Sequence, residues 1–345
     1  MPMLFWNLIP EGKNKTERGF QTMSTKSAAL EKEMQARTTK PKKWLRFYRC
    51  IPLYLMFLPG ALYLLMDKYL PMTGLIIAFK RVNWRKGILA SDWVGFSNFT
   101  YLFKTKDAVT ITRNTVLYNV AFIVLGTVLA ITIAILLNEI TSKKMKQVYQ
   151  TIILLPYLIS IIVVSYLVFA LLSSETGFIN NTVLKAFGAE PISWYTEPKY
   201  WPFILVIVHL WKVFGYDCIL YYATLVGIDQ GYYEAAVIDG ANRWQQIWNV
   251  TIPNLLPTII TLTLMAIGKI FYSDFGLCDQ VQMDSGPLID VTSTIHKYVY
   301  RALVTLNDIP MSSAAGVYQS VVGFVLVLLA NWGVKKIGGE EKGVF

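Results

Sequence analysis

Six long apolar segments separated by polar connections dominate the sequence. They cover residues 51–66, 116–137, 148–172, 201–222, 255–275 and 314–334. A helix rises about 1.5 Å per residue, so roughly 20 residues cross the hydrocarbon core of a bilayer. Because backbone groups in lipid must hydrogen-bond internally, the pattern predicts six transmembrane helices. The first segment is short, and we expect it to continue past Asp67 and Lys68.

The composition supports an all-α membrane protein. Hydrophobic residues make up 54% of the chain and charged residues 16%, with a mean hydropathy of +0.43. Soluble domains carry about 25% charged residues. The net charge of +10 is concentrated near the N-terminus, so it indicates membrane orientation and no nucleic-acid partner. The three cysteines and two histidines lack metal-site spacing, and we expect no metal.

Lysine and arginine residues predict the orientation of the spans. Residues 1–50 hold eleven Lys/Arg against four Asp/Glu, and further basic residues lie at 141–146, Lys335 and Lys336. The external connection at residues 67–115 conflicts with the rule, because it is also basic. The basic tail and the basic 141–146 loop together predict that both termini lie in the cytoplasm, which is the N-in/C-in topology.

The same features divide the chain into four parts. We expect a basic, partly disordered cytoplasmic tail, then a first span with an extracytoplasmic segment, then a core membrane domain, and last a short cytoplasmic tail. In order, these parts cover residues 1–50, 51–112, 113–334 and 335–345. The core domain contains a polar cytoplasmic helix at 229–244, between the fourth and fifth spans.

This polar helix is the most informative cytoplasmic feature. It opens with Glu234-Ala235-Ala236, Asp229 is placed to cap its start, and Gly240 interrupts it. A short helix of this kind suits docking into a groove of another protein. It equally suits a helix that lies on the lipid headgroups. The residues alone leave both interpretations open.

The motif around this helix resembles a known family. Glu-Ala-Ala, a glycine four residues after the second alanine, and then Ile252-Pro253 form the EAA signature of ATP-binding-cassette (ABC) importer permeases. Further matches are PMTGLIIAFK, GFSNF, LLPYLIS, YEAAVIDGANRWQQIW and ANWGVKK. Together they resemble the polysaccharide and oligosaccharide permeases of this family. The resemblance runs from about Leu53 to the C-terminus.

The resemblance implies a type I ABC importer permease fold in a bacterial plasma membrane. It implies that the EAA loop is a coupling helix docked in a separate ATPase, with ATPase-coupling residues Glu234, Ala235, Ala236, Asp239, Gly240 and Arg243. No GxxxxGK[ST] motif occurs in the sequence, so ATP and Mg are expected on the partner ATPase and no cofactor on this chain. The implied partners are a second permease subunit, two ATPase subunits and an extracytoplasmic solute-binding protein.

Charged and aromatic residues inside the spans suggest where a solute passes. Intramembrane charges are costly and tend to face a cavity or a partner. Sites that bind sugars combine aromatic rings, which pack against the apolar face of the sugar, with hydrogen-bonding groups. The candidates are Trp211, Lys212, Tyr216, Lys269, Tyr272, Asp274, Tyr318 and Gln319. Ion pairs between Lys212 and Asp274, or between Lys269 and Asp217, are the structural alternative.

Three other functions remain open to test. An ion-gradient-driven secondary transporter would need no ATPase-docking helix. A permease of the same class for a non-sugar solute would share every feature of the fold. An integral-membrane enzyme would need nucleophiles, paired carboxylates or metal ligands in the membrane, and His209 and His296 lack that spacing. We therefore expect a non-catalytic subunit.

Overall fold

The computed structural model describes residues 43–104, 106–271 and 275–338. The chain divides between Met72 and Thr73 into two compact units. The first unit is one continuous helical rod, built from α2 (Lys43–Leu64), the π-helical η1 (Leu65–Tyr69) and α3 (Leu70–Met72).

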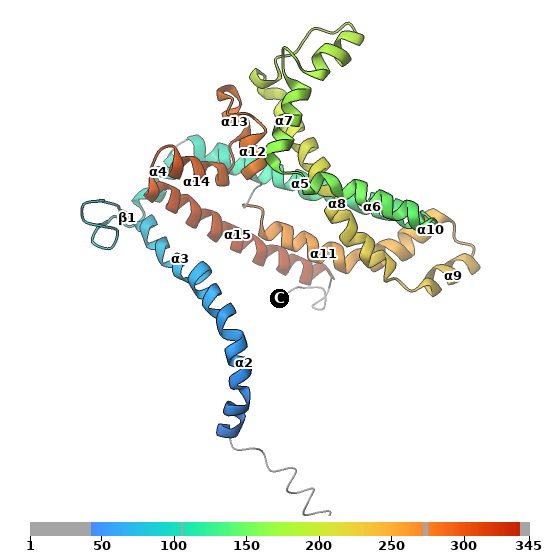
Figure 1. Cartoon of the computed structure of the whole chain (residues 1–345), viewed down its shortest axis with the longest axis horizontal. Coiled ribbons are helices and arrows are strands. Elements are labelled where there is room, and N and C mark those ends of the chain that lie inside the picture. The colour runs from blue at the N-terminus through green and yellow to red at the C-terminus, as the bar shows by residue number, and fades with distance from the viewer. Residues whose placement is uncertain (1–42, 105, 272–274, 339–345) are drawn as a thin grey trace, which may run out of the picture. The chain divides into compact units, whose positions relative to one another are not determined.

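The second unit contains the other helices and one short hairpin (Figure 1). Its first part comprises the 3-10 helix η2 (Thr73–Phe79), β1 (Lys80–Arg81), β2 (Asp92–Trp93), α4 (Ser97–Lys104), α5 (Lys106–Glu139), α6 (Lys143–Leu158), α7 (Ile161–Leu172), η3 (Ile179–Leu184), η4 (Trp194–Thr196) and η5 (Pro198–Tyr200). Its second part comprises α8 (Trp201–Val226), α9 (Gln230–Ile238), α10 (Arg243–Gln246), η6 (Ile247–Thr251), α11 (Ile252–Gly268), α12 (Phe275–Gln280), η7 (Gly286–Leu288), α13 (Ile289–Thr292), α14 (Ile295–Val304) and α15 (Ile309–Gly338).

The helices confirm a multi-pass membrane protein. Among the described residues, five helices are long and apolar enough to cross a bilayer, and the bent pair α6 and α7 makes a sixth span if it counts as one. The first of these runs from Cys50 to Phe79, so it continues past the Asp67–Lys68 ion pair (2.9 Å) as expected.

The third predicted span, residues 148–172, is divided between two helices, α6 and α7. The chain bends by 93° between α6 and α7, at Ile159 and Ser160. Ser160 caps α7 by accepting a hydrogen bond from Val163 N, which lets a new helix start in a new direction. Pro156 lies within the last turn of α6, where a helix is easily ended.

The core of the second unit is centred on α5 and α8, which pack along each other. Close approach is possible because α5 presents small side chains, Ala130 and Ala134, against Cys218 and Tyr221 of α8. A second cluster, around Trp201 and the α7 helix, fills the other half of the bundle. These contacts fix the relative positions of the helices that line the candidate site.

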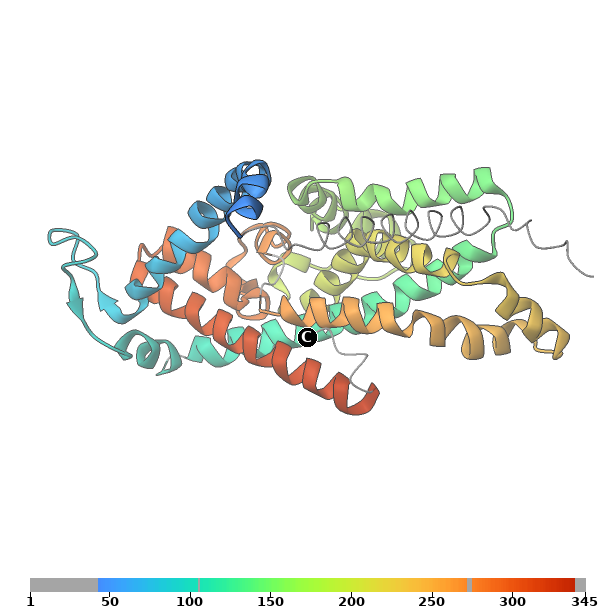
Figure 2. The same cartoon turned by 90° about the horizontal axis from the view of Figure 1, so that it is seen from below.

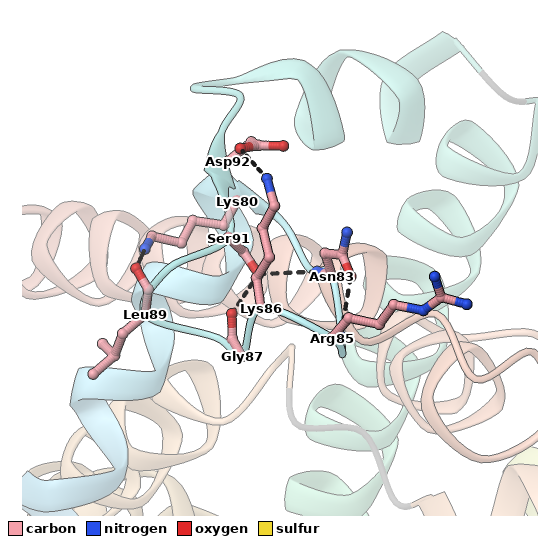
Figure 3. Close-up of polar contacts among 8 residues, drawn as sticks. All are labelled: Lys80, Asn83, Arg85, Lys86, Gly87, Leu89, Ser91 and Asp92. Carbon is pink, nitrogen blue, oxygen red and sulfur yellow. Dashed lines mark hydrogen bonds and ion pairs between the residues drawn. The ribbon is translucent and has the colours of Figure 1, made fainter.

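A hydrogen-bonded hairpin connects η2 to α4 (Figure 3). The Lys80 ammonium is buried and donates to the Leu89 carbonyl, while Ser91 accepts from Asn83 N (2.9 Å) and donates to Gly87 O (2.6 Å). One of the basic residues that conflicted with the charge rule therefore has a structural role. The hairpin and α9 lie at opposite ends of the long helices in Figures 1 and 2.

Candidate functional site: a coupling segment and an aromatic cavity

Residues 229–246 form a short, well-capped element at one end of the second unit (Figure 2). Asp229 caps α9 as predicted, accepting from Gly231 N at 2.9 Å. Gly240 follows α9 with φ of +80°, a conformation that glycine adopts without strain. Asn242 and Gln245 then form a reciprocal capping box that starts α10. The glycine turn therefore joins two separate helices. We call residues 229–246 the coupling segment, after the role that the family resemblance implies for them.

The coupling segment presents apolar and acidic side chains to the outside. Ile238 is 84% exposed and Trp244 is 70% exposed. Glu234, Ala235 and Asp239 are also exposed, and Ala236 is half-buried. Large apolar side chains that a helix leaves uncovered mark a surface that another molecule covers.

Two contacts tie the coupling segment to the membrane helices, and a third closes it on itself. Arg243 pairs with Glu139 at the end of α5 (3.5 Å). The Tyr233 hydroxyl lies 3.1 Å from the Thr251 hydroxyl, which is buried in η6 next to α11. Gln246 donates to Ala241 O at 3.0 Å, which closes the loop between α9 and α10. The segment therefore contacts the end of α5 and the residue that precedes α11.

A cavity of about 440 Å³ lies between α5, α6, α8 and α11. Its polar and aromatic lining residues are Asn119, Phe122, Thr127, Tyr157, His209, Tyr216, Asp217, Tyr221, Thr263 and Lys269. Tyr157 and Tyr216 stack with ring centroids 4.8 Å apart. Phe122 stacks on His209 at 3.8 Å. Aromatic faces beside amide, hydroxyl and charged groups suit a sugar, which has an apolar face and a polar rim.

The structure brings only some of the predicted path residues to this cavity. Tyr216 and Lys269 line it, together with Asp217. No ion pair joins Asp217 to Lys269, both of which lie in the described part of the chain. Both charges line the cavity from different elements, Asp217 from α8 and Lys269 from the residue that ends α11.

Other candidates have different surroundings. The Lys212 ammonium donates to backbone carbonyls of Tyr157 (3.3 Å) and Ile159 (2.6 Å). Trp211 is exposed on α8 and is not among the residues that line the cavity. Tyr272 and Asp274 lie outside the described residues.

The two candidates on α15 pack inside the protein. Tyr318 stacks edge-on against Phe103 (5.1 Å), and its hydroxyl lies 3.5 Å from that of Thr112. Gln319 is 3% exposed. Neither residue lines the cavity between α5, α6, α8 and α11.

Sequence reasoning missed Asn119 and Tyr157 and gave His209 no role in a path. Each lies in an apolar run, where one polar or aromatic residue gives little sign of which face it occupies. The signal that was available is the cluster His209, Lys212 and Asp217 within one span, which marks α8 as a cavity-facing helix.

Residues 275–308, which precede α15, form a folded cap. Lys297 of α14 is buried, pairs with Asp279 of α12 (3.7 Å) and donates to Cys278 O (3.3 Å). Burial lowers the pKa of Lys297, and the Asp279 carboxylate opposes that shift by raising it. Asn114 of α5 donates to Asp290 O at 2.7 Å, which fixes the cap on the bundle.

Comparisons with known proteins agree with this architecture. The family model described as "Binding-protein-dependent transport system inner membrane component" matches residues 123–337. Protein LplB of Bacillus subtilis (strain 168) is 34% identical, over 85% of this chain and 91% of LplB. The polygalacturonan/rhamnogalacturonan transport system permease protein YteP of the same organism is 33% identical, over 85% of this chain and 90% of YteP.

Solved structures give the same result. A crystal structure of a bacterial ABC transporter involved in the import of the acidic polysaccharide alginate superposes with a TM-score of 0.79 and 32% identity, over 86% of this chain and 99% of that chain. A second structure holds the alginate transporter in complex with its pentasaccharide-bound periplasmic protein (TM-score 0.79, 31% identity, 87% and 99% covered). The chain therefore belongs to the family of binding-protein-dependent transport system inner membrane components, as a multi-pass permease subunit of an ABC importer.

Proposed function

We propose that this chain forms half of the membrane pore of an ATP-driven importer of oligosaccharides, with both termini in the cytoplasm. The observation that carries the proposal is that the same helices serve two sites. α5 and α11 line the aromatic cavity, and α5 and η6, which leads into α11, hold the coupling segment. A movement of the segment therefore changes the walls of the cavity directly.

The cavity supports an oligosaccharide cargo. It combines stacked aromatic rings with amide and hydroxyl groups and carries one acidic and one basic side chain. Polygalacturonan/rhamnogalacturonan and arabinooligosaccharides appear in the names of relatives, and alginate in the titles of the similar structures. A volume of about 440 Å³ suits a few sugar residues at a time.

The exposed face of the coupling segment supports docking to a separate ATPase subunit. In this proposal, Glu234 meets a basic residue of the ATPase, and Ala235 and Ala236 permit close approach. Gly240 permits the turn that lets α9 project from the bundle. A second permease subunit completes the pore, two ATPase copies drive it, and an extracytoplasmic solute-binding protein delivers the sugar.

Glu234→Lys tests the coupling role. Glu234 is exposed and belongs to the surface proposed to meet the ATPase. The variant should reach the membrane in normal amount, because an exposed charge contributes little to folding. We expect ATP-driven sugar uptake and co-purification of the ATPase to fall.

Glu190→Lys, an exposed glutamate outside the coupling segment, is the matched control and should transport normally. Normal uptake by Glu234→Lys would contradict the coupling role. Uptake of a non-sugar solute by the intact complex would instead correct the cargo and leave the coupling role in place.

A further inference from the structure

The bend between α6 and α7 leaves backbone carbonyls at the end of α6 that need partners. α6 ends at Leu158 and α7 starts at Ile161 in a direction 93° away. No N–H group of the same helix donates a hydrogen bond to its last carbonyl oxygens. These oxygens also lie at the negative end of the helix dipole. In a membrane such carbonyls require a donor from the protein.

Lys212 of α8 supplies this donor. Its ammonium lies 2.6 Å from Ile159 O and 3.3 Å from Tyr157 O. Charged donors make stronger hydrogen bonds than neutral ones, and a cation at a helix C-terminus is favoured by the dipole. The cost of placing a lysine within a span is thus offset by contacts that only this bend offers.

A second contact holds α6 against α8 one turn further along. At Gly215 the two backbones touch, because a Cβ atom there would lie 1.8 Å from Ile153 O. Residues three apart on a helix face the same side. Lys212 and Gly215 therefore hold the last turns of α6 at two adjacent points.

These contacts reach the wall of the cavity. Tyr157, whose carbonyl accepts from Lys212, stacks its ring on Tyr216 at 4.8 Å, and both rings line the cavity. Lys212 is not among the lining residues. We infer that Lys212 is a positioning residue that holds the bend between α6 and α7, and through it keeps the Tyr157 ring in the cavity wall.

A distance measurement across the bend tests this inference. Ile152 of α6 and Leu167 of α7 are exposed, so each can carry a spin label on an introduced cysteine. The native Cys218 and Cys278 are buried, and Cys50→Ser removes the third thiol. The full-length chain in lipid nanodiscs should give one narrow label-to-label distance in a double electron–electron resonance experiment.

We expect Lys212→Met to broaden this distance, because the carbonyls lose their donor. Lys212→Arg should restore the narrow distance, since a guanidinium also donates to two acceptors. Lys185→Met removes an exposed lysine elsewhere and should change nothing. An unchanged narrow distance in Lys212→Met overturns the inference.

If Lys212→Met does not reach the membrane, Lys212→Leu takes its place, because it also removes the donor. A broadened distance in Lys212→Leu supports the positioning role, and a distance like that of the wild type overturns it.

The same variants have a functional readout, which rests on the proposed sugar transport. Uptake into proteoliposomes should fall by roughly tenfold or more in Lys212→Met, which loses two hydrogen bonds from a charged donor, and recover in Lys212→Arg. Reduced uptake without recovery in Lys212→Arg contradicts a positioning role. If the distances change as expected but no sugar is transported, the proposed cargo is wrong and the positioning role of Lys212 stands.

Discussion

Gly215→Ala is the substitution whose effect follows most directly from the geometry. The added Cβ atom would lie 1.8 Å from Ile153 O and 2.6 Å from Ile153 C. Both are backbone atoms of α6, so no side-chain rotation relieves the contact. α6 and α8 must separate instead.

The required displacement can be worked out. Cβ atoms essentially never approach another heavy atom closer than 3.0 Å, so at least 3.0 − 1.8 = 1.2 Å of separation is needed. Overpacking that forces backbone shifts costs about 1–3 kcal/mol, and a backbone clash lies at the upper end of that range. The same shift lengthens the Lys212 contact with Ile159 O, now 2.6 Å.

Thermal stability of the purified chain in detergent, followed by fluorescence-detected size exclusion, measures this cost. Gly126→Ala is the matched control, because its Cβ would meet only the Leu210 side chain at an ordinary 3.7 Å. We expect Gly215→Ala to lower the midpoint temperature of thermal unfolding by several degrees. Gly126→Ala should leave this temperature unchanged or raise it. Equal midpoints for the two variants would refute the close contact.

Local features of the coupling segment could be predicted because they depend on nearby residues. Asp229 caps a helix that starts at the next residue, and Gly240 supplies the left-handed turn that ends it. Five of the six apolar runs likewise lie on helices long and apolar enough to cross a bilayer among the described residues, since length and hydropathy decide membrane insertion. In each case the determining residues lie within a few positions of the feature.

The broken third span and the cavity could not be predicted, because they depend on distant residues. The carbonyls of Tyr157 and Ile159 find their donor on Lys212, in a different helix. Tyr318 and Tyr216 are alike in sequence context, yet one packs against Phe103 and the other lines the cavity. Which helix face points inward is settled by packing between helices.

Three more predictions follow from single contacts. Gly240→Val should cost about 1–2 kcal/mol in the coupling turn, where φ is +80°, and lower ATP-driven uptake at normal membrane levels. Arg243→Glu should lower ATP-driven uptake, because the new carboxylate repels Glu139. The exchanged pair, Arg243→Glu with Glu139→Arg, should restore the uptake. The free energy of unfolding should change by less than about 1 kcal/mol, because the pair is exposed. Failure of the exchanged pair to recover would refute the contact. Burial lowers the pKa of Lys297, so the unfolded chain binds more protons between that pKa and 10.5, and stability should rise with pH across this window. The midpoint temperature of thermal unfolding, plotted against pH, should rise across this window, and the rise should be smaller in Lys297→Gln. An identical curve for the variant would contradict the effect of burial.

Uptake of a labelled oligosaccharide into proteoliposomes tests the central claim most directly. The vesicles contain this chain and its second permease, with or without the ATPase, and a loaded solute-binding protein is supplied outside. The account predicts uptake only when both the ATPase and internal ATP are present, and its loss with Glu234→Lys. Equal uptake without the ATPase, or uptake driven by an ion gradient alone, would contradict it.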